Sequence, residues 1–128
     1  MKIRKIAAVY GIIVGLMMMG FWIMYVYTGQ VPEFETEPWY ITTHLVAEFL
    51  TAFALLIGGI GLYTERNWGF HVYLVSMGML LYTVIVSPGH YADLGDTSMI
   101  IMFAILTILT LILISLSILR REEFELIQ

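Results

Sequence analysis

The chain has 128 residues, of which 60% are hydrophobic and 12% are charged, and its formal net charge is −4. About a quarter of the residues in soluble domains are charged, and a chain this short cannot hide so much apolar surface from water. A soluble globular domain is therefore excluded, and lipid is the expected solvent.

Four apolar runs are long enough to cross a bilayer as helices. The hydrocarbon core is about 30 Å thick, so a spanning helix needs about 20 residues. The four runs cover residues 6–27, 39–63, 68–87 and 97–119. None shows the alternation of apolar and polar residues that is typical of barrel strands. The sequence therefore predicts one domain, residues 1–128, that is all-α: an integral membrane four-helix bundle.

The connectors between these runs are short and polar. Segment 28–38 holds three acids and two prolines, and Pro38 suits the first turn of the second helix. Segment 64–67 reads as a tight turn. Segment 88–96 is predicted to end the third helix and to supply Asp96 as the N-cap of the fourth. Because connections this short join neighbouring helices, the bundle is expected to be antiparallel.

The basic residues predict the orientation of the bundle. All six would lie on one side of the membrane: Lys2, Arg4, Lys5, Arg66, Arg120 and Arg121. The first and third connectors carry only acids. Because cytoplasmic segments retain Lys and Arg, both termini are predicted to face the cytoplasm of a prokaryotic cell, with the chain as a multi-pass protein of the cell membrane. Segment 120–125 is predicted to be a solvated helix end.

Small residues recur at four-residue steps in the first two spans. Ala7, Gly11 and Gly15 form one such row, and Ala54 and Gly58 form another. Such rows let helix backbones approach closely in lipid. We expect them to pack within one chain, and contact between copies in a homo-oligomer is the alternative.

Two titratable residues share one face of the second span. Glu48 lies about 13 Å into the helix from Trp39, and His44 lies one turn nearer the border. A charge at the centre of a span costs about 2.5 to 3.5 kcal/mol, and such residues usually face the bundle interior. Thr51 and Leu55 continue the face and make it apolar. This favours a one-sided pocket in the outer half over a continuous channel.

Other polar and aromatic residues are predicted to reach the same depth. Tyr82 on the third helix and Trp22 on the first would complete a ligand-binding set with His44 and Glu48. A divalent metal is one candidate occupant, held by the imidazole and carboxylate groups of His44, Glu48, His90 and Asp93.

A quinone headgroup is a second candidate, because His44 and Glu48 could exchange protons with a quinol. A haem with two histidine ligands would need His44 and His90, and it is less favoured because His90 is expected in a connector. A small proton-coupled transporter would use Glu48 as its titrating group. In the structural alternative, Glu48 only forms a hydrogen bond to a neighbouring group and so fixes the register between helices.

Three segments resemble those of small, uncharacterised prokaryotic membrane proteins with four predicted spans. The segments are residues 28–38, 44–49 and 79–91. The resemblance supports the span assignment and implies no activity.

The sequence thus favours a membrane protein that binds a small metal, cation or quinone-like ligand around His44 and Glu48. A structural or accessory subunit of a larger membrane complex is the main alternative. No nucleophile and base pattern, phosphate loop or redox motif indicates an enzyme. The absence of cysteine excludes thiol chemistry, and no basic patch indicates nucleic acid.

Overall fold

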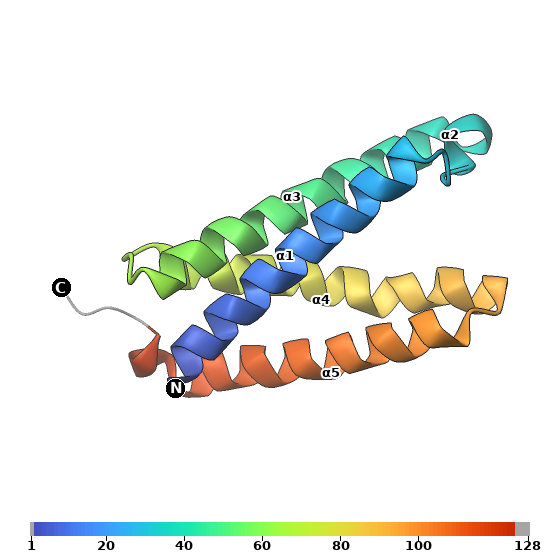
Figure 1. Ribbon diagram of the computed structural model, residues 1–128. Coiled ribbons are helices and arrows are strands. Elements are labelled where there is room, and N and C mark those ends of the chain that lie inside the picture. The colour runs from blue at the N-terminus through green and yellow to red at the C-terminus, as the bar shows by residue number, and fades with distance from the viewer. Residues whose placement is uncertain (1, 125–128) are drawn as a thin grey trace.

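A computed structural model describes residues 2–124 of the chain and shows an all-helical fold (Figure 1). The elements are α1 (Ile3–Tyr27), α2 (Glu33–Thr36), α3 (Pro38–Tyr63), α4 (Gly69–Leu94), α5 (Thr97–Leu119) and a final 3₁₀ turn, η1 (Arg121–Glu123). All but the two short elements are long and apolar enough to cross a membrane. The four predicted helices are confirmed, and α5 has the predicted bounds.

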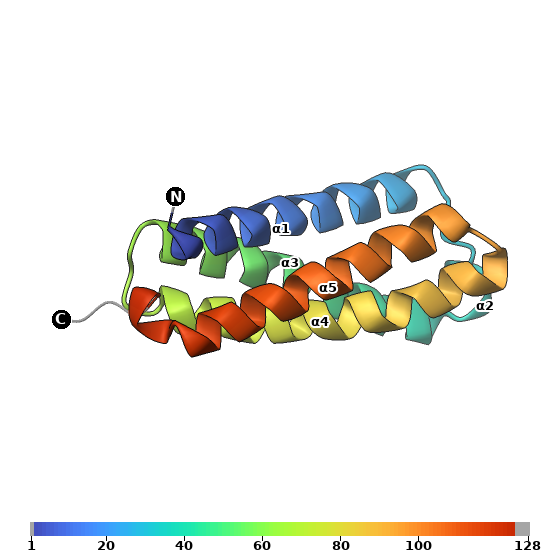
Figure 2. The same cartoon turned by 90° about the horizontal axis from the view of Figure 1, so that it is seen from below.

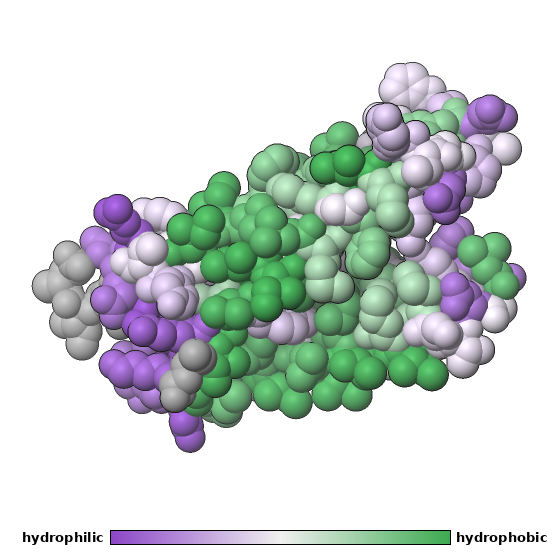
Figure 3. Space-filling model, in the orientation of Figure 1, coloured by the Kyte–Doolittle hydropathy of each residue, from purple (hydrophilic) through white to green (hydrophobic). Residues whose placement is uncertain are grey.

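The long helices pack in chain order, with α1 against α3, α3 against α4, and α4 against α5. Both ends of the described chain lie at the same end of the bundle as the turn between α3 and α4 (Figures 1 and 2). We call this the basic end, because all the Lys and Arg residues lie there. The opposite end holds α2 and is called the acidic end. Polar side chains gather at both ends, with an apolar belt between them (Figure 3).

Helix α4 is longer than expected and runs through Pro88 to Leu94. The predicted connector over residues 88–96 is therefore wrong for most of its length. Proline at this position deprives the Val84 carbonyl of its helical donor. The Thr107 hydroxyl on α5, which donates to the Phe103 carbonyl at 2.7 Å, also lies 3.3 Å from the Val84 carbonyl, so the freed carbonyl has a polar neighbour on the next helix. The chain turns only at Gly95, which has φ 74°.

The ends of the neighbouring helices follow the sequence more closely. Pro38 lies in the first turn of α3, as predicted. Asp96 is the N-cap of α5, and its carboxylate accepts a hydrogen bond from the Met99 backbone N–H at 3.3 Å. The helix α2 in the first connector was not predicted.

Small residues bring α1 and α3 together within the chain. A Cβ atom on Gly15 would lie 3.0 Å from the Ala52 carbonyl oxygen, and one on Gly59 would lie 2.9 Å from that of Ala8. Backbone contacts this close leave no room for larger side chains. The expected intramolecular packing of the small-residue rows is therefore confirmed.

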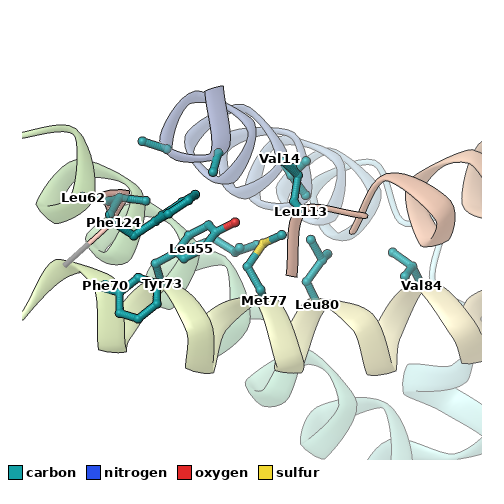
Figure 4. Packing of buried hydrophobic residues seen from close by; sticks show 12 residues of the cluster. Val14, Leu55, Leu62, Phe70, Tyr73, Met77, Leu80, Val84, Leu113 and Phe124 are labelled. Carbon is teal, nitrogen blue, oxygen red and sulfur yellow. The ribbon is translucent and has the colours of Figure 1, made fainter. Parts of the chain in front are cut away.

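Apolar side chains of α4 line the core, among them Tyr73, Met77, Leu80 and Val84 (Figure 4). Polar bonds join the helices around this core. The Tyr10 hydroxyl on α1 lies 2.8 Å from the Thr110 hydroxyl on α5, and the Ser117 hydroxyl on α5 donates to the Tyr73 hydroxyl at 3.2 Å. Within residues 2–124, every buried polar side-chain atom has a hydrogen-bond partner. This satisfies the main requirement that an apolar environment places on buried polar groups.

Arg4 is buried at the basic end, with 4% of its surface exposed. Its Nη1 donates to the Leu62 carbonyl oxygen at 2.6 Å, and its Nη2 donates to the Glu65 carboxylate at 2.9 Å. Leu62 is in the last turn of α3, and its carbonyl has only a long backbone hydrogen bond, from the Glu65 N–H at 3.4 Å. Arg4 therefore ties the start of α1 to the end of α3. In the sequence, Arg4 was interpreted only as one of the basic residues that predict the orientation of the bundle.

Replacing Arg4 with Gln should lower the free energy of unfolding by about 2 kcal/mol, because the buried Leu62 carbonyl loses its charged donor. Thermal unfolding in a mild detergent measures the change. Arg66→Gln is the matched control, since it removes one exposed positive charge from the same end. Equal melting temperatures for the two variants would contradict this role of Arg4.

The segment after α5 folds back onto the bundle. Phe124 is 1% exposed, and its ring centroid lies 5.7 Å from that of Phe70 and 6.1 Å from that of Tyr73. The prediction of a solvated helix end is therefore wrong for Phe124. The reason is that the 3₁₀ turn η1 redirects the chain toward the start of α4, where the rings of Phe70 and Tyr73 contact the side chain.

Candidate functional site

Glu48 lies on α3 in the interior of the bundle, with 8% of its surface exposed. The Thr83 hydroxyl on α4 donates to the Glu48 Oε1 atom. His44, one helical turn earlier on α3, places its Nε2 atom 3.5 Å from the same oxygen. The structure therefore gathers an imidazole, a carboxyl group and a hydroxyl group around a single oxygen atom.

Thr83 joins the site because it lies on the buried stripe of α4. Ser76, Leu80 and Thr83 recur at steps of four and three residues, and all three are buried. This spacing keeps them on one face of the helix, which packs against α3. Sequence reasoning missed Thr83, although the stripe of small and apolar residues was a signal that could have found it.

Aromatic rings cover His44. The Trp22 ring on α1 meets the imidazole edge-on at 5.7 Å between centroids, and the Tyr40 ring stacks on it at 5.9 Å. Tyr25 contacts Trp22 in turn at 6.2 Å. His44 keeps 29% of its side chain exposed. The imidazole therefore lies at the edge of the site, between the buried carboxyl group and the surface.

Tyr91 was expected in a connector above the site. Because α4 continues past Pro88, Tyr91 lies instead on this helix, two turns beyond Thr83. Its ring stacks on Phe103 of α5 at 5.7 Å, so the pair joins α4 to α5 near the acidic end.

One oxygen of the Glu48 carboxyl group has no protein donor. The hydrogen bonds within residues 2–124 reach Oε1 and leave Oε2 without one. No side-chain oxygen in this part of the chain is both fully buried and unpartnered. Oε2 is therefore accessible, and it can receive a hydrogen bond or a positive charge from a ligand.

The interior below the site is closed by α3 itself. The Thr51 hydroxyl donates to the Ala47 carbonyl of its own helix at 2.8 Å, and Leu55 in the next turn is 1% exposed. No polar group on this face continues the site toward the basic end. At the acidic end the surface is hollowed between the ends of α1 and α3 and those of α4 and α5 (Figure 3).

The structure brings Trp22, His44 and Glu48 together and leaves three other expected residues apart. Tyr82 is 70% exposed, because its neighbour Thr83 faces α3 instead. His90 and Asp93 are exposed on the last turns of α4. Within residues 2–124 there is no group of three or more His, Asp or Glu side chains that could hold a metal ion. The four-ligand metal set is therefore not assembled.

The charge around the site is negative. Five acids lie at the acidic end: Glu33, Glu35, Glu37, Asp93 and Asp96. All Lys and Arg residues of the chain are at the other end. A field of one sign at the mouth of a site raises the local concentration of counter-ions, so this end attracts cations.

A family model described as Domain of unknown function (DUF8058) matches residues 1–126. The chain belongs to this family. No curated protein and no solved structure matches it. The description of the DUF8058 family agrees with the resemblance to uncharacterised proteins, and it names neither an activity nor a membrane. The function of this DUF8058 chain is therefore argued from the geometry around Glu48.

Proposed function

We propose that the chain is a multi-pass membrane protein that binds a small organic cation through Glu48. The observation that carries this proposal is the state of the Glu48 carboxyl group. It is 8% exposed among apolar helices; one oxygen is contacted by Thr83 and His44, and the other has no donor among residues 2–124. A buried acid inside a span is costly, and such residues usually mark a binding site or ion path.

The membrane and the orientation belong to this proposal. Four helices have the length and composition of spans. All six Lys and Arg residues lie at the basic end, which the positive-inside rule assigns to the cytoplasm. The acidic end and the mouth of the site would then face outward from the cell membrane.

An organic cation fits the site better than the other candidate ligands. The rings of Trp22 and Tyr40 cover His44, whose Nε2 atom lies 3.5 Å from the Glu48 carboxyl group, and the faces of aromatic rings attract positive charge. A carboxyl group one helical turn from such rings suits an ammonium or phosphonium ion. A divalent metal would need further ligands, and of the expected ligands in the described part of the chain only His44 and Glu48 come together.

A quinone-like ligand is the second candidate. It is favoured by the 3.5 Å approach of the His44 imidazole to the Glu48 carboxyl group, since such a pair could exchange protons with a quinol. A transporter would use the same carboxyl group, with proton and cation competing for it.

An accessory role in a larger complex is the structural alternative. Of α5, only Thr110, Leu113 and Ser117 are buried. The rest of this helix offers an apolar surface to lipid or to a partner chain.

Titration with tetraphenylphosphonium tests the proposal directly. In a Trp39→Phe, Trp68→Phe background, Trp22 is the sole tryptophan, so its fluorescence reports binding beside His44. We expect saturable quenching. Glu48→Gln should weaken the affinity about tenfold or more, because it removes the anion and keeps an oxygen for the Thr83 hydroxyl.

Glu37→Gln is the matched control, since it removes one exposed negative charge from the same end. The affinity of the Glu37 variant for tetraphenylphosphonium should stay within about twofold of that of the parent protein. An unchanged affinity in Glu48→Gln would refute the assignment, and saturable binding of decylubiquinone in place of the cation would favour the quinone reading.

A further inference from the structure

A cavity lies at the basic end, far from Glu48. Its volume is about 500 Å³, and its lining residues are Lys2, Arg4, Lys5, Tyr63 and Glu65. Three of the five are basic and one is acidic. Because Arg4 already pairs with Glu65 at 2.9 Å, the two lysines are left as the uncompensated charges of the cavity.

The lysines are attached to a helix start that is itself positive. Lys2 is the N-cap of α1, its side chain makes no capping hydrogen bond, and the first turn holds no acidic residue. The N-terminus of a helix carries partial positive charge and unpaired backbone N–H groups, which attract anions. Lys5 is held in place by the Tyr63 ring, with its Nζ atom 5.7 Å from the centroid. The cavity, the two lysine side chains and the start of α1 therefore all favour a negatively charged ligand.

We propose that this cavity binds the phosphate group of an anionic phospholipid. The surface beside the cavity suits the rest of such a molecule. Ile6 on α1 and Ile60 on α3 are about half exposed and lie next to the lining residues along their helices. Tyr63 and Trp68 are exposed near the helix ends, where aromatic rings settle at headgroup level in membrane proteins. A lipid can occupy the charged cavity and the apolar surface together, whereas free phosphate can occupy only the cavity.

The test uses the full chain, delipidated in dodecyl maltoside, with melting temperature as the readout. Dioctanoyl phosphatidylglycerol should raise the melting temperature saturably. Dioctanoyl phosphatidylcholine, with the same chains and a compensated headgroup, and inorganic phosphate should not do so at the same concentrations. Lys2→Gln with Lys5→Gln should weaken the apparent affinity for phosphatidylglycerol about 10- to 30-fold.

Arg120→Gln with Arg121→Gln is the matched control, because it removes two positive charges from the same end outside the cavity. Its affinity should change less than about threefold. Both double variants keep the Arg4 hydrogen bonds, so their melting temperatures should equal that of the parent protein when lipid is absent. Equal losses in the two double variants, an unchanged affinity in the lysine variant, or stabilisation by inorganic phosphate alone would each overturn the proposal.

Discussion

Replacing Gly58 with alanine should lower the free energy of unfolding by about 3 kcal/mol. Gly58 lies where α3 crosses α4, and a Cβ atom there would lie 2.7 Å from the backbone nitrogen of Tyr73 and 2.8 Å from its Cα atom. These are backbone atoms, which cannot rotate away as a side-chain tip can. The two helices would have to separate along a contact that also carries the hydrogen bond between Thr83 and Glu48.

Gly78→Ala is the control for the glycine substitution. Gly78 is an exposed residue of α4, and nothing lies within 4 Å of the position that a Cβ atom would take. Because alanine favours the helix, this variant should be as stable as the parent protein or gain about 0.5 to 1 kcal/mol. Unfolding by dodecyl sulfate in mixed micelles, followed by circular dichroism, compares the two. Equal losses in both variants would show that helix propensity, and not the crossing, determines the result.

The four long helices could be predicted from the sequence because their signal is local. Length and apolarity alone define α5, whose predicted and observed bounds coincide. The row from Ala7 to Gly15 also predicted a close contact, and the structure shows it between α1 and α3. A local signal does not identify the helix against which each helix face packs. Gly58 was expected to approach another helix, and only the structure shows that Tyr73 of α4 is its neighbour.

Pro88 shows where a local rule was overridden by a distant residue. Proline normally ends a helix because it leaves a carbonyl without a donor. Here the hydroxyl of Thr107, on the next helix, lies 3.3 Å from that carbonyl. Nothing in the sequence near Pro88 reveals this contact, so the extension of α4 and the helical positions of His90 and Tyr91 could not be foreseen.

The candidate site was partly predictable for the same reason. The spacing of His44 and Glu48 places them on one face whatever the helix packs against, and the structure keeps them 3.5 Å apart. Choosing between Tyr82 and Thr83 requires the rotation of α4 about its axis. Two adjacent residues differ by about 100° around a helix, so only one of them faces α3. The size and polarity of tyrosine favoured the wrong one.

Phe124→Ala should cost about 3 to 5 kcal/mol of unfolding free energy, a loss expected for a fully buried phenylalanine. Phe124 is 1% exposed. Its ring is stacked on Tyr73, with 22° between the planes, and the Tyr73 hydroxyl accepts the hydrogen bond of Ser117. Removing the ring would leave a cavity beside a residue that joins α4 to α5. Phe124→Leu, which keeps most of the volume, should cost about 1 kcal/mol.

Phe53→Ala separates burial from the mere loss of a phenyl ring. Phe53 is 52% exposed on α3, so its truncation should change the unfolding free energy by no more than about 0.5 kcal/mol. If Phe124→Ala and Phe53→Ala unfold alike, the docking of the chain end onto α4 does not stabilise the fold. Because Phe124 packs at the basic end and Glu48 opens toward the acidic end, Phe124→Ala should also leave the tetraphenylphosphonium affinity of the folded protein unchanged. A fall in that affinity would mean that the two ends are coupled through α4, the helix that carries both Tyr73 and Thr83.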